Sequence, residues 1–229
     1  MSYPKNPYEI IVKNEYYPSG LKEVDIWNYY QQNKRNILKE TLGKTLIVFF
    51  ATSLNKTTVI RKNKSKGLIR LSPTDYNTII SGRTLSLHSI MDRYSKYGII
   101  DIDTNDFNKA KDVVIDIFNI MEAARFAKSL QIRFTGKKSF HIKIEFNAEY
   151  KIEDIRKMIF DYLIESNVQQ KYTITNKRIR NIPNIDLNRN VYNAGYITLH
   201  SLSITGLKCM EVPLKKVKNF RKEDAKIFN

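Results

Sequence analysis

The segment that most restricts how this chain can fold is residues 98–103, an apolar run that ends in two carboxylates. If the run is a strand, alternation places Asp101 and Asp103 on one face and Ile100 and Ile102 on the other. At about 3.3 Å per residue, the two aspartate α-carbons would lie roughly 6.6 Å apart. That spacing suits carboxylates that bridge two hard cations about 3.5–4 Å apart. The alternative is a solvated strand end that caps the next helix, and Asp-x-Asp alone leaves both interpretations open.

The pattern around this strand predicts an α/β fold. A helix capped by Asn105 or Asp106 should run to about Leu130, and strands over 131–135 and 140–146 should flank a basic turn. This order of strand, helix, two strands, helix and strand is typical of a split β-α-β arrangement, whose helices cover one face of an antiparallel sheet. The opposite face is then free to carry a site. The other expected elements are a helix over 21–40, a buried strand over 44–52, a basic loop or hairpin over 55–70, a helix over 153–165 and short strands over 197–214.

A second motif, residues 135–141, reads Thr-Gly-Lys-Lys-Ser-Phe-His. Ser139 and His141 should share one strand face with Lys143, while Phe140 and the isoleucines after it take the buried face. Gly136 lets a ligand approach the backbone closely. Hydroxyls, lysine and imidazole on one face suit an anion. The alternative is an ordinary basic hairpin, and the turn by itself favours that alternative.

A third acid, Asp186, stands alone in a basic and polar stretch. It is either a third metal ligand or the partner of Arg178, Arg180 or Arg189. From this segment alone, the ion pair is the preferred interpretation.

The charge and cysteine content restrict partners and location. The chain has 229 residues and a formal net charge of +16, which favours a polyanionic partner, with nucleic acid first. No basic amphipathic helix and no apolar run of membrane-spanning length supports a membrane partner. The single cysteine, Cys209, excludes an intrachain disulfide and a cysteine-based zinc site. The first residues lack the apolar core of a signal peptide, so we expect a cytoplasmic, nucleoid-associated protein.

The three motifs together resemble the archaeo-eukaryotic primase superfamily in order and spacing. The chain looks most like its primase-polymerase branch, which includes the polymerase domain of bacterial ligase D. Residues 16–21 (Tyr-Tyr-Pro-Ser-Gly-Leu), 59–63 (Val-Ile-Arg-Lys-Asn) and 85–88 (Leu-Ser-Leu-His) are similar to segments of that domain. The helix that bears Trp27, Tyr29 and Tyr30 is similar too, and the similarity covers roughly residues 15–214.

The resemblance implies a single primase-polymerase catalytic domain over 1–229, built as two mixed β-sheet lobes with flanking helices. An N-terminal α/β lobe would cover about 1–95, an RRM-like lobe about 96–214, and a basic tail 215–229. Two Mg²⁺ or Mn²⁺ ions would bind the metal triad. The implied metal ligands are Asp101, Asp103 and Asp186, and the implied triphosphate contacts are Thr135, Lys138, Ser139 and His141, joined by Lys62 and His88.

The activity implied is template-directed addition of nucleotides from an NTP or dNTP to a 3′-hydroxyl, by a DNA primase, a DNA polymerase or both. The partners would be a DNA template or primer-template, together with a helicase, ligase or other replication or repair protein. The residues expected to contact nucleic acid are Arg61, Lys64, Lys66, Arg70, Arg178 and Arg180. The alternatives are a non-catalytic RRM-like module that binds nucleic acid and a metal-dependent nuclease.

The sequence departs from the ligase D pattern at two places. Thr104 and Asn105 follow the acidic pair where that domain usually has proline. Residues 192–196 contain no arginine, whereas relatives tend to carry one shortly before the final strand, and Arg189 is a candidate substitute. Nucleotide affinity or sugar choice could therefore differ from the family norm.

Overall fold

The computed structural model describes residues 4–62, 67–104, 106–175 and 184–228. Its contacts divide the chain into two compact units, each assembled from separate segments. Unit 1 comprises Met1–Ile90, Ile197–Met210 and Arg221–Asn229, and unit 2 comprises Met91–Tyr196 and Glu211–Phe220. The expected lobes are each continuous in sequence, whereas residues 197–210 return to unit 1, because Thr198 N–H donates to the carbonyl of Leu87 at 2.9 Å.

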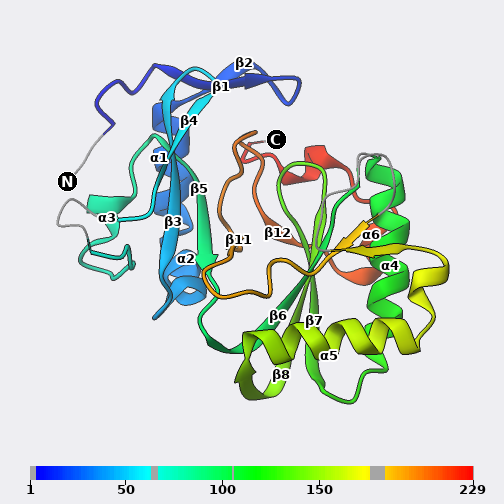
Figure 1. The fold of residues 1–229 in the computed structure, drawn as a ribbon. Coiled ribbons are helices and arrows are strands. Elements are labelled where there is room, and N and C mark those ends of the chain that lie inside the picture. The colour runs from blue at the N-terminus through cyan, green and yellow to red at the C-terminus, as the bar shows by residue number, and fades with distance from the viewer. Residues whose placement is uncertain (1–3, 63–66, 105, 176–183, 229) are drawn as a thin grey trace. The chain divides into compact units, whose positions relative to one another are not determined.

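Unit 1 contains a two-stranded sheet, β1-β2, and a four-stranded sheet in the order β11-β5-β3-β4 (Figure 1). The buried strand expected over 44–52 is β3, and the basic segment after it forms a hairpin with β4. The elements of this unit are β1 (Ile10–Asn14), β2 (Tyr17–Lys22), α1 (Glu23–Gln32), α2 (Lys34–Thr41), β3 (Leu46–Ser53), β4 (Lys56–Ile60), α3 (Tyr76–Ile79), β5 (Thr84–Ile90) and η2 (Lys222–Ala225), together with β11 (Gly195–Ile197), which begins in the last two residues of a unit 2 segment.

The single helix expected over 21–40 is wrong, because the chain breaks at Asn33 into α1 and α2. The Asn33 side chain donates to the carbonyl of Tyr29 at 2.9 Å, as its own backbone N–H does at 3.0 Å. A short amide side chain that bonds its own backbone competes with helix continuation. Of the apolar residues in this segment, Trp27 and Ile37 are buried, while Val24 and Leu38 are only half-buried.

Unit 2 contains a six-stranded sheet in the order β12-β7-β8-β6-β10-β9. Strand β8 pairs antiparallel with both β6 and β7, and β10 pairs antiparallel with β6. This order and these directions confirm the split β-α-β arrangement. The elements are β6 (Tyr94–Ile102), α4 (Phe107–Glu122), β7 (Ala127–Phe134), β8 (Phe140–Lys151), α5 (Ile152–Glu165), η1 (Val168–Gln170), β9 (Thr173–Thr175), β10 (Asn184–Asp186), β12 (Met210–Glu211) and α6 (Leu214–Val217).

Helix α4 begins where the sequence predicts and ends earlier. The Asp106 side chain accepts hydrogen bonds from the N–H groups of Asn108 and Lys109, at 2.9 and 3.2 Å, so it is the N-cap. Asn105, the other candidate cap, lies outside the described residues. The expected end near Leu130 is wrong, because α4 stops at Glu122 and Leu130 belongs to β7. Leu130 pairs there with Ile144 of β8, and that pairing decides its conformation.

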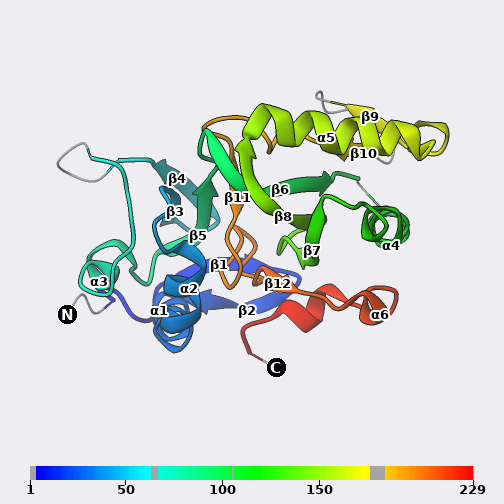
Figure 2. The ribbon, with the colours of Figure 1, turned by 90° about the horizontal axis from the view of Figure 1, so that it is seen from below.

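Helices α4 and α5 cover one face of the unit 2 sheet (Figures 1 and 2). A Cβ added to Gly98 would lie 2.9 Å from Ile155 and from Ile159, so only glycine lets α5 pack this closely on β6. On α4, Phe107 stacks on Phe140 with ring centroids 5.5 Å apart. Phe140 pairs with Ile102, which lies two residues from Ile100 and four residues from Gly98 along β6. These residues therefore point to one face of the sheet, and both helices pack on that face. The other face of β6 carries Asp101.

Candidate metal and triphosphate site

Four polar side chains form a row across the face of the sheet that the helices leave uncovered. Asp101 of β6 is paired with His141 of β8 and with Asp186 of β10, and His141 is paired with Arg133 of β7. Directly paired residues on antiparallel strands point to the same face, and their side chains are neighbours. The strand pairing therefore places Asp101 between two neighbours, with Asp186 on one side and His141 on the other.

Asp101 is buried, and its two carboxylate oxygens differ. Oδ2 accepts a hydrogen bond from Nε of Arg189 at 3.3 Å. Oδ1 lies 3.5 Å from Nε2 of His141, but among the described residues no donor reaches it with hydrogen-bond geometry. The Nδ1 atom of His141 is likewise buried without a partner in that part of the chain. A buried carboxylate oxygen without a donor is costly, and it fits the ligand set of a hard cation.

The electrostatics of the row also suit a cation. Burial by itself would raise the pKa of Asp101, but His141 and Arg189 outweigh burial and hold the pKa below its usual value. Burial raises the pKa of Asp186; the Asn188 N–H opposes this shift, and the charges of Asp101 and Asp103 add to it. The carboxylates therefore repel one another, and a divalent ion between them would relieve that repulsion.

Asp103 lies one residue beyond the end of β6, so it extends the row from a loop rather than from the strand. Its Oδ1 is 3.7 Å from Nζ of Lys138, which belongs to the turn between β7 and β8. Among the described residues, no three acidic, histidine or cysteine side chains are close enough together to hold a metal ion as they stand. The metal triad therefore stays a prediction, with its members on neighbouring segments.

The turn expected to bind phosphates is closed by its own hydroxyls. Both the N–H and Oγ1 of Thr135 donate to the carbonyl of Ser139 at 3.0 Å, and the two hydroxyl oxygens lie 2.9 Å apart. Gly136 has φ +80°, a left-handed conformation that glycine adopts without strain. These contacts hold the turn so that Lys138 reaches Asp103, which places a cation beside the acids. Phe140, Ile142 and Ile144 are fully buried on the opposite face, as expected.

Two further residues of this region were not singled out from the sequence. Arg133 is only 2% exposed, and its Nε donates to Oε1 of Gln131. Asn190 is fully buried; its Oδ1 accepts from the N–H of Ile99 at 2.7 Å, and its Nδ2 donates to the Ile99 carbonyl at 2.6 Å. Asn190 thus continues along β6 the pairing that β10 ends at Asp186. Alternation along residues 131–135 places Arg133 on the polar face with Gln131 and Thr135 and was the available signal, whereas Asn190 had none.

The sequence favoured an ion pair between Asp186 and an arginine, but the described residues give Asp186 a backbone hydrogen-bond donor instead. Its Oδ1 accepts from the N–H of Asn188 at 2.7 Å, while Arg189 donates to Asp101 and to the carbonyl of Gly195. The other proposed partners, Arg178 and Arg180, lie outside the described residues. Asp186 is therefore held by the turn that follows it.

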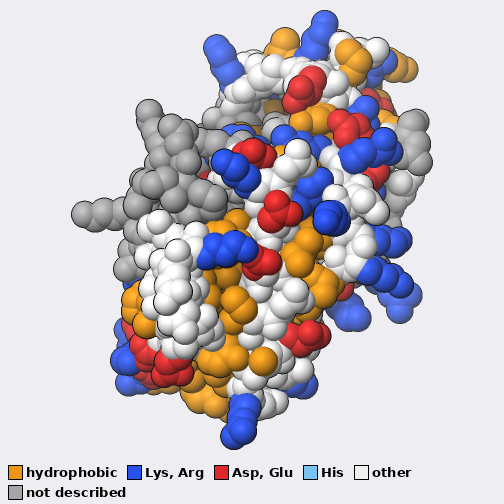
Figure 3. Space-filling model, turned by 90° about the vertical axis from the view of Figure 1, so that its right-hand side faces the viewer, with side chains coloured by type: hydrophobic (Ala, Val, Ile, Leu, Met, Phe, Trp, Pro, Cys, Tyr) orange, Lys and Arg blue, Asp and Glu red, His pale blue; other side chains and the backbone are white. Residues whose placement is uncertain are grey.

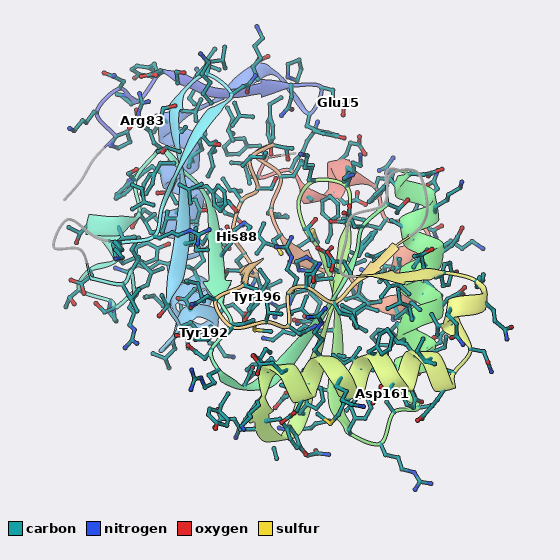
Figure 4. All side chains as sticks on the ribbon, in the orientation of Figure 1. Glu15, Arg83, His88, Asp161, Tyr192 and Tyr196 are labelled. Carbon is teal, nitrogen blue, oxygen red and sulfur yellow. The ribbon has the colours of Figure 1, made fainter. Side chains whose placement is uncertain are left out.

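The remaining site candidates belong to unit 1. His88, labelled in Figure 4, lies on β5; its Nε2 is 3.0 Å from Oγ of Ser86, and its ring is 4.7 Å from that of Phe49. Lys62 forms an isolated bridge with Leu68 and is exposed. Two of the predicted nucleic-acid contacts, Arg61 and Arg70, are exposed, and the other two of that cluster, Lys64 and Lys66, lie outside the described residues.

Charge is mixed on the face of the molecule in Figure 3, where lysine and arginine side chains alternate with aspartate and glutamate. That face shows no extended area of a single sign. In the described part of the chain, no helix combines the length and the apolar composition needed to cross a bilayer.

Comparison with known proteins identifies the fold. No family model matches the sequence, and no curated protein matches it. Among solved structures, the polymerase domain of Mycobacterium tuberculosis ligase D, in complex with DNA, superposes with a TM-score of 0.80. The match covers 96% of this chain and 90% of that domain, at 11% sequence identity. This chain therefore has the fold of the ligase D polymerase domain.

Proposed function

We propose that this protein is a template-directed nucleotidyltransferase that adds nucleotides from an NTP or dNTP to a 3′-hydroxyl. The observation that carries the proposal is the row formed by Asp186, Asp101 and His141 on three adjacent strands. The buried Oδ1 of Asp101, which lacks a donor among the described residues, supports a cation at this position. The ligase D polymerase fold adds a scaffold of the matching class.

In this proposal Asp101, Asp103 and Asp186 hold Mg²⁺ or Mn²⁺. Bound there, the ions would activate the attacking hydroxyl and neutralise charge on the triphosphate. Lys138 would exchange its contact with Asp103 for a phosphate oxygen, as a charge-assisted hydrogen bond. His141 is buried and paired with Asp101, so it would orient the phosphates against the acidic row. Thr135 and Ser139 would keep the turn in the shape that presents Lys138.

The proposal also assigns residues of unit 1 to triphosphate binding and to contacts with a nucleic-acid template. Lys62 and His88 would add to triphosphate binding, and Arg61 and Arg70 would contact nucleic-acid phosphates. Lys64, Lys66, Arg178 and Arg180 would extend those phosphate contacts. The ligase D domain to which the chain is similar was solved with DNA, which supports a nucleic-acid partner. A helicase, ligase or other replication or repair protein would supply the activities that accompany strand synthesis.

Two other functions explain fewer of the observations. A non-catalytic RRM-like module accounts for the sheet and the charge, but it does not require buried acids facing one another. A metal-dependent nuclease would use the acids, but it has no need of a lysine-bearing turn beside them. Calorimetry with nucleotide in the presence and absence of Mn²⁺ separates the three functions, because only the nucleotidyltransferase requires metal-dependent triphosphate binding.

The direct test is incorporation of labelled nucleotides on templates with and without a primer. The wild-type protein should extend a primer in the presence of Mn²⁺, and the double variant Asp101→Ala, Asp103→Ala should not. Circular dichroism and DNA binding by the double variant serve as controls for its fold. Robust extension by a folded double variant would refute the proposal, and products without a primer would identify a primase.

A further inference from the structure

The Arg189 guanidinium contacts the carboxylate of Asp101, which lies between Asp186 and His141 in the row. Its Nε donates to Oδ2 of Asp101 at 3.3 Å, and its Nη1 donates to the carbonyl of Gly195 at 3.0 Å. The planar guanidinium is a cation, so it brings a positive charge to this carboxylate. Asp101 thus has a resident counter-charge in the absence of any metal ion.

The backbone that carries Arg189 is fixed on both sides. Before it, the N–H of Asn188 donates to Oδ1 of Asp186 at 2.7 Å. After it, the buried Asn190 side chain binds both the N–H and the carbonyl of Ile99. The Arg189 side chain itself is 40% exposed. Arg189 can therefore leave Asp101 by side-chain rotation towards solvent while the backbone of the row stays in place.

The two oxygens of Asp101 are consequently unequal towards a cation. Oδ1 faces Nε2 of His141 at 3.5 Å without hydrogen-bond geometry, whereas Oδ2 accepts a hydrogen bond from Arg189. A carboxylate that binds an ion through both oxygens, or that bridges two ions, needs Oδ2 as well. A guanidinium and a divalent ion at the same oxygen also repel each other, and burial strengthens that repulsion.

We propose that Arg189 is a resident cation which a divalent metal ion must displace from Asp101, so that this residue sets the metal affinity of the site. The inference rests on the proposed function, because it takes Asp101 as a metal ligand. It goes beyond that function in naming the group that opposes metal binding. It also separates Arg189 from Lys138, whose contact with the acids lies at Asp103.

The test measures Mn²⁺ binding to the protein without nucleotide, and the electron paramagnetic resonance signal of the free ion reports how much Mn²⁺ is unbound. Removing the charge with Arg189→Gln should tighten Mn²⁺ binding at least about fivefold, because one repulsive unit charge beside the ion is removed. Arg189→Lys keeps the charge and should stay within about twofold of the wild-type affinity. The matched control is Arg93→Gln, which removes the same charge from a guanidinium that lies 5.8 Å from the Tyr192 ring centroid, before β6 begins.

The second measurement is the melting temperature of the protein in thermal unfolding. Without metal, Arg189→Gln removes one of the two groups, together with His141, that stabilise the Asp101 carboxylate, so it should lower the melting temperature. Saturating Mn²⁺ should raise the melting temperature of this variant by more than that of the wild type. Equal or weaker Mn²⁺ binding by folded Arg189→Gln would overturn the inference, since Arg189 would then position Asp101 for the metal. Mn²⁺ binding that survives the Asp101→Asn, Asp103→Asn double variant would instead overturn the metal assignment in the proposed function.

Discussion

Replacing Asn190 with alanine should destabilise the protein strongly, although this residue lies outside every motif. Asn190 is fully buried, and its side chain makes three hydrogen bonds, two with Ile99 and one with the carbonyl of Leu187. Alanine removes all three and leaves the N–H and the carbonyl of Ile99 without the partner that they have now. Each buried polar group left unsatisfied costs about 1–3 kcal/mol, so the two groups of Ile99 together cost roughly 2–6 kcal/mol.

The assay is equilibrium unfolding in urea, compared with thermal unfolding. For a chain of this size each kcal/mol shifts the melting temperature by about 2–4 °C, so Asn190→Ala should lower it by roughly 4–24 °C. The matched control is Asn108→Ala, the same chemical change at an exposed position of α4, which should stay within about 0.5 kcal/mol of the wild type. A destabilisation below about 1 kcal/mol at Asn190 would show that water replaces the missing hydrogen bonds, and would refute the reasoning.

Three further predictions concern packing, nucleotide binding and charge. Gly98→Ala should destabilise the protein by about 1–3 kcal/mol in the same urea assay, because its Cβ would collide with two isoleucines of α5; a neutral result would show that α5 shifts away freely. His141→Ala should weaken nucleotide binding in calorimetry by about 1.5–3 kcal/mol and DNA binding far less, and unchanged nucleotide affinity would leave the residue a structural role. Neutralising Lys64, Lys66 and Arg70 together should reduce the slope of log DNA affinity against log salt by about 0.7–0.9 for each DNA phosphate that the protein no longer neutralises, and an identical slope would place the DNA path elsewhere.

Local geometry made much of the site readable from the sequence. A strand repeats every two residues, so alternation alone predicted that Ile100 and Ile142 are buried on the face opposite Asp101 and His141. The cap at Asp106 could be read for the same reason, since an N-cap needs only a short side chain that reaches the next turn. The order of elements in unit 2 followed from these local patterns.

The ends of the helices depend on tertiary and side-chain contacts, which the local sequence pattern does not record. The residues near Leu130 suit a helix as well as a strand, and pairing with β8 decided that they form β7. The break at Asn33 depended on whether its side chain bonded the backbone of Tyr29 or pointed to solvent. Periodicity is the same for both outcomes, so neither boundary could be read from it.

The sequence by itself determined the chemistry available to this protein: acids at strand spacing, a lysine-bearing turn and a large positive charge. Only the tertiary structure decided which groups meet. Antiparallel pairing of β10 with β6 placed Asp186 beside Asp101, and the turn after β10 gave Arg189 to Asp101 instead of Asp186. Strand register between distant segments is set by burial of whole faces and by buried hydrogen bonds, such as those of Asn190. These interactions exist only once the chain has folded, so no local pattern records them.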